Sequence, residues 1–303
     1  MTKIAASILI ICFCLMACSS SKILELNGKK YKITAPPGTV QIAENLYADE
    51  TEINNINYRE YIYWMKRVYG EQSSEYLDCL SDKKVWENAN IDSSSDYSYF
   101  DHPAYNDYPI IGITLKQAQN YTNWRTDRVA ENILIQKKAV KRNLDAIKEN
   151  HFTIERYLSG DFPWIIEKKE TMLPEYRIPN ELEWEMLAYG KMSNSLGVDS
   201  LSRMVKKWIG KGHSLFNMDN LSENRQYESF PMSPCQSYPP NSFGLYNTIG
   251  NVSEMISNKA SSKGGSWKDL QDECLIDNAM EFDEPNCWTG FRNICTWRLS
   301  SEF

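Results

Sequence analysis

Cysteine has the widest chemical range of the residue types in this sequence, since its thiol can take a lipid, pair in a disulfide or bind a soft metal. The chain holds 8 Cys but only 3 His, and His102, His151 and His213 are far apart in the sequence. A histidine-rich metal centre would require all three to converge on one point. We therefore do not expect a histidine-based metalloenzyme.

Cys18 stands at a possible lipid attachment site. An apolar run from Ile4 to Ala17 follows Lys3, which is typical of a signal peptide and is too short to span a bilayer comfortably. Small residues before Cys18 and serines after it resemble a bacterial lipobox. We therefore expect residues 1–17 to be a lipoprotein signal peptide and Cys18 to carry acyl chains that anchor the protein stably. The alternative is an ordinary signal peptide that happens to contain cysteines.

The residues after Cys18 also indicate the membrane in which the protein is anchored. No acidic residue follows Cys18 directly, which by resemblance to enterobacterial sorting favours the outer membrane. No later segment reaches 18 consecutive apolar residues, so we expect no second membrane anchor. The sequence thus predicts a lipidated tether over residues 18–35 and a folded domain over residues 36–303, on the periplasmic face.

Disulfide bonds are the second use of cysteine in an oxidising compartment. Cys12 and Cys14 belong to the signal segment, and an odd number of cysteines remains in the folded part. Up to two disulfides and one free thiol are possible, and spacing alone does not choose the pairs. The five remaining residues are Cys79, Cys235, Cys274, Cys287 and Cys295.

Composition bounds the class of protein. The 303 residues are 42% hydrophobic and 24% charged, which is close to the globular average and excludes wholesale disorder. The net charge of −7 argues against a nucleic-acid partner, because such domains are normally basic.

Local patterns predict the elements that must position any site. Helical spacing of apolar residues predicts a helix over 57–70, and Thr114 with Gln117 predicts a capped helix from 114 to beyond 128. Asn180 with Glu183 marks a third helix, which runs to Gly190. Short strands are expected at 39–43 and 109–113.

Two longer stretches have weaker patterns. Residues 71–107 are rich in Ser, Asp and Tyr and indicate a long surface loop. A helical stripe continues from Val129 to Ile147, with Lys137, Lys138, Lys141 and Arg142 around it. This basic cluster is either a solvated helix face, which we favour, or a contact for anionic lipid or a partner.

Several separated segments are far more specific together than any one of them. In this order and spacing they resemble the formylglycine-generating enzyme (sulfatase-modifying factor) family, over about residues 36–298. The segments are Asp49–Glu52, Pro109–Ile113, Gln117–Ala118, Asn123–Arg125, Arg177–Glu185, Asn241–Glu254, Lys263–Trp267 and Gly290–Arg292.

The resemblance implies a single irregular α+β domain of the C-type-lectin-like formylglycine-generating-enzyme fold. Such a domain has few short strands and several amphipathic helices, and this chain would add a helical insertion at about 129–172. Aromatic rings from the motifs would fill its core, since each buries much apolar area. We assign four tryptophans to this core rather than to ligand stacking: Trp124, Trp184, Trp267 and Trp297.

The resemblance also implies a structural calcium ion. Calcium takes six to eight oxygen ligands and accepts mixed sets of side-chain and backbone oxygens. The alternative is a metal-free turn held by Asn and Glu hydrogen bonds, and a second family site near Asn217 departs too far to carry over. Side-chain oxygens would come from Asn247 and Glu254, and backbone oxygens from Thr248, Gly250 and Val252.

The family's enzymes oxidise a substrate cysteine with copper held by a pair of thiolates. Counted from Gly264–Ser266, the first cysteine position falls on Asp269 and the second on Cys274. Thiolates suit Cu(I), so a carboxylate in place of one of them should spoil the site, and copper is not expected. The resemblance thus implies a pseudoenzyme, with Cys274 as the catalytic residue only if an activity survives.

Three features narrow the resemblance. The lipobox, the stretch His102–Pro109, and Trp124–Thr126 followed by the insertion look like the gliding-motility lipoproteins K and J of Bacteroidota. Those proteins share the fold, lack the cysteine pair and imply a structural role in type IX secretion. This chain is shorter than that branch usually runs.

Three hypotheses follow. The first is a non-catalytic lipoprotein that binds partner proteins in the envelope. The second is an oxidase-type enzyme that uses Cys274. The third, which rests on fold analogy alone, is a module that binds glycan or peptide.

Overall fold

The computed structural model describes residues 21–89, 99–190, 216–218 and 231–303. The signal segment, Cys18 and His213 therefore lie outside the described residues. The described part of the chain falls into two compact units, divided between Ala35 and Pro36. Within the described ranges, no helix combines the length and the apolar character that a membrane span requires.

The first unit contains a β-hairpin. Strand β1 (Lys22–Leu26) pairs antiparallel with β2 (Lys29–Ile33) through a turn at Asn27 and Gly28. Both turn residues have positive φ, 51° and 71°, as a two-residue hairpin turn of the Asn-Gly type requires. Part of the stretch expected to be a tether, residues 18–35, is therefore a hairpin, and its Asn-Gly turn is the local signal for it.

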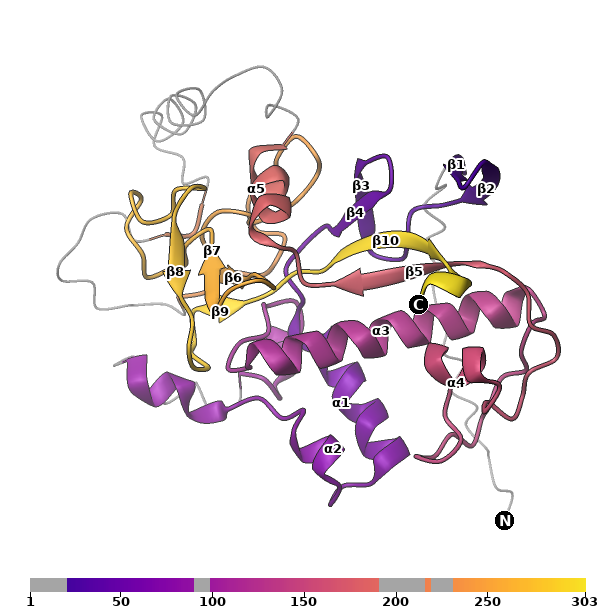
Figure 1. Cartoon of the computed structure of the whole chain (residues 1–303). Coiled ribbons are helices and arrows are strands. Elements are labelled where there is room, and N and C mark those ends of the chain that lie inside the picture. Colours follow the sequence, from indigo (N-terminus) through magenta and orange to yellow (C-terminus); the bar gives the residue numbers. More distant parts are fainter. Residues whose placement is uncertain (1–20, 90–98, 191–215, 219–230) are drawn as a thin grey trace, which may run out of the picture. The chain divides into compact units, whose positions relative to one another are not determined.

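The second unit is built on a four-stranded antiparallel sheet in the order β3-β4-β10-β5 (Figure 1). Its strands are β3 (Thr39–Ala43), β4 (Leu46–Asp49), β10 (Ile294–Leu299) and β5 (Met172–Arg177). The last strand in the sequence is thus placed between two that precede it by more than a hundred residues. Strand β3 confirms the strand predicted at 39–43.

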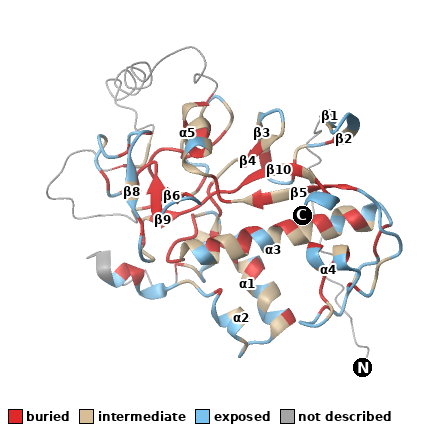
Figure 2. Cartoon of the chain, viewed as in Figure 1, coloured by how far each residue is buried: buried red, intermediate tan, exposed pale blue. Residues whose placement is uncertain are grey.

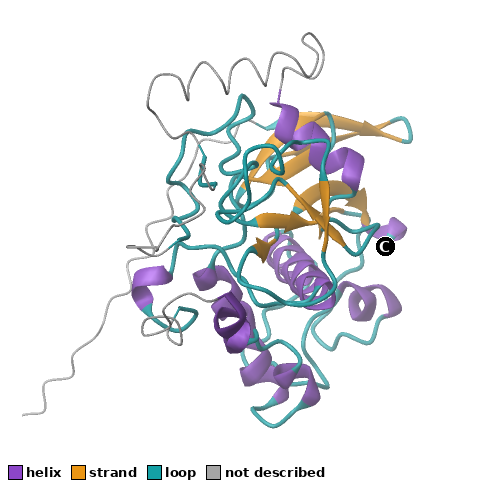
Figure 3. Cartoon of the chain, turned by 90° about the vertical axis from the view of Figure 1, so that its left-hand side faces the viewer, coloured by secondary structure: helices purple, strands orange, loops and turns teal. Residues whose placement is uncertain are grey.

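The three predicted helices are present; the first begins two residues earlier than expected, and the other two begin at the predicted caps. Helix α1 (Asn55–Tyr69) is capped by Asn54, and α3 (Leu115–Gln136) begins with a capping box between Thr114 and Gln117. Helix α5 (Glu181–Tyr189) also begins with a capping box, formed by Asn180 and Glu183. Helices α1 and α3 lie on one side of the sheet and α5 on the other (Figures 1 and 3).

Short elements complete the second unit. A second sheet, ordered β8-β7-β6-β9, holds the segments that follow residue 250. Its strands are β6 (Ser253–Met255), β7 (Ser261–Lys263), β8 (Ala279–Glu281) and β9 (Thr289–Gly290). The short helices are α2 (Ser74–Leu77), η1 (Lys83–Ala89), η3 (Pro103–Tyr105), α4 (Ile154–Ser159) and η5 (Ser300–Glu302).

Three expectations about elements were wrong. Residues 109–113 form no strand, because Pro109 makes only an isolated bridge to Asn54. The helical stripe stops at Gln136, since Lys138 takes a left-handed conformation and Val140 bridges to Ile165. Residues 71–107 are not one loop, because three short helices interrupt the described part of this stretch.

The core is rich in aromatic side chains, as predicted. Trp184, Trp267 and Trp297 are at most 7% exposed, and Trp124 is partly buried against the cluster around Tyr58. Figure 2 shows the buried residues gathered on the strands and on the sides of the helices that face them. The architecture is a mixed α+β fold with few short strands, as expected.

Candidate functional site

Three segments from the resemblance meet at the carboxylate of Glu254, on strand β6. Arg292, which follows β9, donates from Nε to both carboxylate oxygens at 2.9 Å and from Nη2 to Oε1 at 2.6 Å. Trp184, on α5, donates from Nε1 to Oε2 at 2.7 Å. Glu254 is 1% exposed, and Arg292 and Trp184 are fully buried. Four donor contacts therefore hold one buried carboxylate.

Arg292 links this carboxylate to the first sheet and to the loop before β6. Its Nη1 donates to the Asp49 carbonyl oxygen at 3.0 Å, and its Nη2 donates to the Tyr246 carbonyl oxygen at 2.6 Å. Burial in itself lowers the pKa of Arg292, but Glu254, with smaller contributions from Glu52 and Asp49, raises the pKa above its ordinary value. Arg292 is therefore a charged structural residue at the centre of the second unit.

A second buried carboxylate, Glu52, lies between β4 and α1 and is 1% exposed. Its Oε1 accepts from Asn251 Nδ2 at 2.9 Å, and its Oε2 accepts from Asn247 Nδ2 at 3.3 Å. Burial raises the pKa of Glu52 to about 7, although nearby Arg292 opposes the rise. Glu52 is thus poised to hold or release a proton near neutral pH.

The loop 247–251 is shaped by its own polar side chains. Asn247 and Asn251 have positive φ of 49° and 62°, a conformation that asparagine tolerates better than most residues. Gly250 also has positive φ, and a Cβ there would lie 2.4 Å from the Asn217 carbonyl oxygen. Asn251 Oδ1 accepts from Asn217 Nδ2 at 3.2 Å. The loop and the segment at 217 therefore fit closely together.

The residues expected to bind calcium are close in the chain, but the side chains of two of them, Asn247 and Glu254, already have protein partners. Asn247 Nδ2 donates to Glu52 and to the Cys235 carbonyl oxygen, and the oxygens of Glu254 accept four donor contacts. A carboxylate offers about four lone-pair directions, so Glu254 would have to release a donor to ligate a metal. As arranged, Glu254 does not fit a calcium site, and calcium remains an untested prediction.

Asp269 and Cys274 stand where the resemblance places the copper-binding cysteine pair, and neither is arranged as a metal ligand. Asp269 Oδ2 accepts from Ser266 Oγ at 2.5 Å, and burial raises the pKa of Asp269. Cys274 is 2% exposed, and its Sγ lies so close to Gly265 that an added Cβ there would be 2.2 Å away. Burial raises the pKa of the Cys274 thiol to about 12, with Asp269 adding to the rise.

A thiol of this kind is a weak nucleophile and a weak metal ligand, because the thiolate is the reactive form. Cys274 packs in a cluster with Trp184, Ile256 and Ile276. One carboxylate and one protonated, enclosed thiol do not fit a copper site that requires two thiolates. The arrangement supports Cys274 as a core residue.

The other described cysteines are also core residues. None of the five is in a disulfide bond, so the disulfides left open by the sequence are not formed in this structure. Cys79 Sγ donates to Tyr61 Oη at 2.9 Å, and burial raises the pKa of this thiol to about 11. Among the residues that the structure describes, no group of three or more His, Cys, Asp or Glu side chains could hold a metal ion.

The described histidines have structural roles. His102 caps the short helix η3 through a bond from the Ala104 amide, and His151 lies 3.1 Å from Tyr69 Oη through its Nε2. The stretch from His102 is fixed to α1, because Asn55 Nδ2 donates to the Tyr105 carbonyl oxygen at 2.9 Å.

Sequence reasoning missed the roles of Glu52, Asn251 and Arg292. All three belong to segments that carried the resemblance, but only the 247–254 segment was assigned ligands. A possible signal was the set of charged residues inside otherwise buried motifs, because a buried charge requires a partner of opposite charge. Spacing could not show that the partner of Glu254 lies 38 residues further along the chain.

Comparison with known proteins gives one family match and several weak structural likenesses. A search of curated proteins found no match. The solved structures that resemble this chain include CarF, at 20% identity over 83% of this chain and 86% of that chain, with a TM-score of 0.42. Treponema denticola variable protein 1 is 14% identical over 91% of this chain and 99% of that chain, with a TM-score of 0.41.

PvdO from Pseudomonas aeruginosa is 13% identical over 92% of each chain, with a TM-score of 0.42. The family described as the sulfatase-modifying factor enzyme 1-like domain matches residues 19–296, which is most of the chain. The match includes every segment that meets at Glu254. This protein therefore belongs to the FGE-sulfatase family.

Proposed function

We propose that this chain is a non-catalytic member of its family and serves as a structural or partner-binding component of a bacterial envelope complex. The observation that carries the proposal is the Asp269–Cys274 position. Asp269 is bonded to Ser266 there, and Cys274 is enclosed with its pKa raised to about 12. Oxidation of a substrate thiol by copper requires a thiolate pair, and this position supplies at most one thiol.

The buried framework supports the same role. Glu254, Arg292 and Trp184 join segments from three parts of the chain without leaving an open reactive group. A domain that retains this framework while losing the copper ligands is well suited to present a surface. We infer that its surface, rather than an active site, is what other envelope proteins use.

The finer proposal concerns location. Cys18 and the signal segment support a lipid anchor in the outer membrane, with the domain on the periplasmic face. The stretch His102–Pro109 and the segment after Trp124 support a place in a type IX secretion or gliding-motility complex. Residues 102–104 are exposed on the surface and available to a partner.

Native purification tests the partner-binding role. The lipidated protein is extracted from membranes in mild detergent, and co-purifying proteins are identified with their stoichiometry. We expect a partner in fixed ratio that Cys18→Ser weakens and Cys274→Ser leaves unchanged. Deletion of the gene with no change in secretion, motility or envelope assembly would overturn the proposal.

Two further measurements test the enzyme hypothesis and the calcium prediction. Cys274→Ser should leave every phenotype intact, and a lost oxidation activity would instead restore the enzyme hypothesis. Metal analysis after mild purification tests calcium. About one calcium per chain that Glu254→Gln removes would support the predicted site, while the absence of calcium would leave the turn metal-free.

A further inference from the structure

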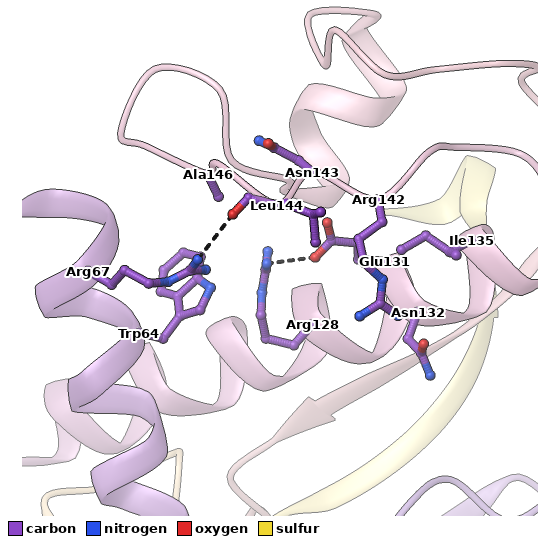
Figure 4. A pocket seen from close by; sticks show the side chains of 10 residues that line it. All are labelled: Trp64, Arg67, Arg128, Glu131, Asn132, Ile135, Arg142, Asn143, Leu144 and Ala146. Carbon is purple, nitrogen blue, oxygen red and sulfur yellow. Dashed lines mark hydrogen bonds and ion pairs between the residues drawn. The ribbon is translucent and has the colours of Figure 1, made fainter. Parts of the chain in front are cut away.

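A hollow of about 420 Å³ lies away from the family motifs, between α1, α3 and the loop that follows α3. Figure 4 shows Trp64 and Arg67 entering it from α1, Arg128 and Glu131 from α3, and the loop around Arg142 closing it from above. Cavities of this volume are in the range that holds small organic ligands.

The lining follows from helix geometry. Residues three, four and seven positions apart share one face of a helix, so Arg128, Glu131 and Ile135 all point to the same side of α3. Trp64 and Arg67 are related in the same way on α1. The loop reaches the hollow because α3 stops at Gln136, which is also why the predicted helical stripe failed.

The hollow is positively charged in an acidic chain. Three arginines, Arg67, Arg128 and Arg142, face one carboxylate, Glu131, whereas the whole chain carries a net charge of −7. Burial raises the pKa of Glu131, and all three arginines oppose the rise, led by Arg128. One carboxylate cannot neutralise three guanidinium groups, so two positive charges remain.

Arg128 is committed to the protein. Its Nη1 pairs with Glu131 Oε2 at 2.7 Å, its Nη2 donates to the Phe152 carbonyl oxygen, and its guanidinium lies 4.6 Å from the centre of the Trp64 ring. Its Nε is buried without a hydrogen-bond partner among the described residues. Arg128 is thus a fixed, largely buried cation at the side of the hollow.

Arg67 and Arg142 differ from Arg128 in their exposure and in their partners. Both are exposed, and neither forms an ion pair with any residue that the structure describes. Arg67 Nη1 makes only a 3.4 Å contact with the Leu144 carbonyl oxygen. These two guanidinium groups therefore retain most of their donors for a ligand.

The remaining lining is mixed: Asn132 and Asn143 are polar, and Trp64, Ile135, Leu144 and Ala146 are apolar. The Trp64 ring, Ile135 and Leu144 line the same hollow, and Leu144 is 75% exposed although it is a large aliphatic residue. An exposed leucine beside a tryptophan ring offers a surface for a flat apolar group. Apolar side chains beside polar groups that fix a ligand's orientation are found in many small-molecule sites.

We propose that this hollow binds a small molecule that carries a phosphate monoester and a flat apolar part. The phosphate would accept hydrogen bonds from Arg67 and Arg142, whose fork geometry and two positive charges match its oxygens and its charge of about −2. The apolar part would contact Trp64 and Leu144. This site is independent of the envelope role proposed above.

Isothermal titration calorimetry with phenyl phosphate tests the site on the whole chain. Inorganic phosphate supplies the anion without the ring, benzyl alcohol supplies the ring without the anion, and benzoate supplies a single negative charge. We expect phenyl phosphate to bind most tightly of the four. Equal binding of benzyl alcohol or benzoate would overturn the proposal.

Variants assign the binding to the hollow. Arg67→Gln with Arg142→Gln should weaken phenyl phosphate by about tenfold or more, since hydrogen bonds to charged groups are lost. Lys141→Ala is the matched control, because it removes an exposed positive charge beside Arg142 without lining the hollow. Both changes are at exposed positions, and unchanged thermal unfolding would confirm that the variants fold.

A lipid headgroup could present the same phosphate chemistry. Vesicles of phosphatidylcholine with phosphatidic acid separate the two sources. Binding of phenyl phosphate alone identifies a soluble ligand, and binding of both, lost together in the double variant, identifies a headgroup. If Lys141→Ala weakens binding as much as the double variant does, general basic charge rather than this hollow is responsible and the proposal fails.

Discussion

Glu254 and Arg292 form a buried ion pair in which neither side chain is more than 1% exposed. Taking two charges out of water costs several kcal/mol for each ion, and the cost is recovered only when geometry and further hydrogen bonds are favourable. Here the Trp184 indole and two backbone carbonyls complete the bonds. A pair of this kind is sensitive to the loss of either partner.

Glu254→Gln should therefore destabilise the domain by about 3–5 kcal/mol, because it removes the only carboxylate that is hydrogen-bonded to the buried Arg292 side chain among the described residues. Urea unfolding followed by tryptophan fluorescence measures the change. Glu71→Gln is the matched control, since Glu71 pairs with Lys66 at the surface and such pairs contribute about 0–1 kcal/mol. Equal losses in the two variants would contradict the structural role of the buried pair.

Glu52 predicts a pH dependence of stability. Its pKa is about 7 in the folded protein against an ordinary 4.5, so the folded state holds the proton more tightly than the unfolded state. Its contribution is therefore fully present below 4.5 and is lost as the pH rises through 7. Glu52→Gln removes the titration and should lose less stability than the wild type between about pH 5 and about pH 8.

Urea unfolding at both pH values measures this difference. Other groups titrate in the same range, since burial also raises the pKa of Asp127 to about 6, so only the difference between wild type and variant reports on Glu52. Asp127 accepts a bond from the Ile154 amide at a separate place in the fold. Identical pH slopes in wild type and variant would show that Glu52 does not titrate here.

At the scale of elements, helix ends depend on single side chains. Thr114 Oγ1 accepts from the Gln117 amide at 3.1 Å, and Gln117 Oε1 accepts from the Thr114 amide at 2.7 Å. Gln117 Nε2 also donates to the carbonyl oxygens of Asp78 and Leu80. This capping box therefore ties the start of α3 to the segment after α2.

Thr114→Ala should cost about 1 kcal/mol in the free energy of unfolding, because the Gln117 amide loses its acceptor. Chemical denaturation measures the loss. Thr114→Ser keeps the hydroxyl and should recover most of the stability. A serine variant as unstable as the alanine variant would show that packing of the methyl group, rather than the cap, fixes this end of the helix.

Signals of this local kind explain what could be predicted from the sequence. The starts of α3 and α5 were found because each capping side chain acts within three residues of its partner, whereas α1 was found from the spacing of its apolar residues. The end of α3 was missed because the stripe from Val129 to Ile147 kept its helical period. The deciding contact was the bridge from Val140 to Ile165, which no local pattern shows.

At the scale of the whole molecule, the pairing of strands that are far apart in the sequence brings the residues of the site together. Strand β10 completes the first sheet between β4 and β5, and this brings Arg292 to the Asp49 and Tyr246 carbonyls. The sequence motifs indicated the family and the missing thiolate at Asp269. They could not indicate the hollow beside Trp64, because α1, α3 and the loop form it only after they pack together.

The proposed lipid anchor would determine where this framework acts, and Cys18→Ser tests it. If Cys18 carries the acyl chains, the variant should leave the membrane fraction for the soluble periplasmic fraction, because several acyl chains are needed for stable anchoring. Cys14→Ser is the matched control, since it removes a thiol from the signal segment four residues earlier. Cell fractionation with labelled fatty acid measures both location and acylation. Wild-type protein that takes up no label would remove the lipoprotein assignment, and the envelope role would then require another means of attachment.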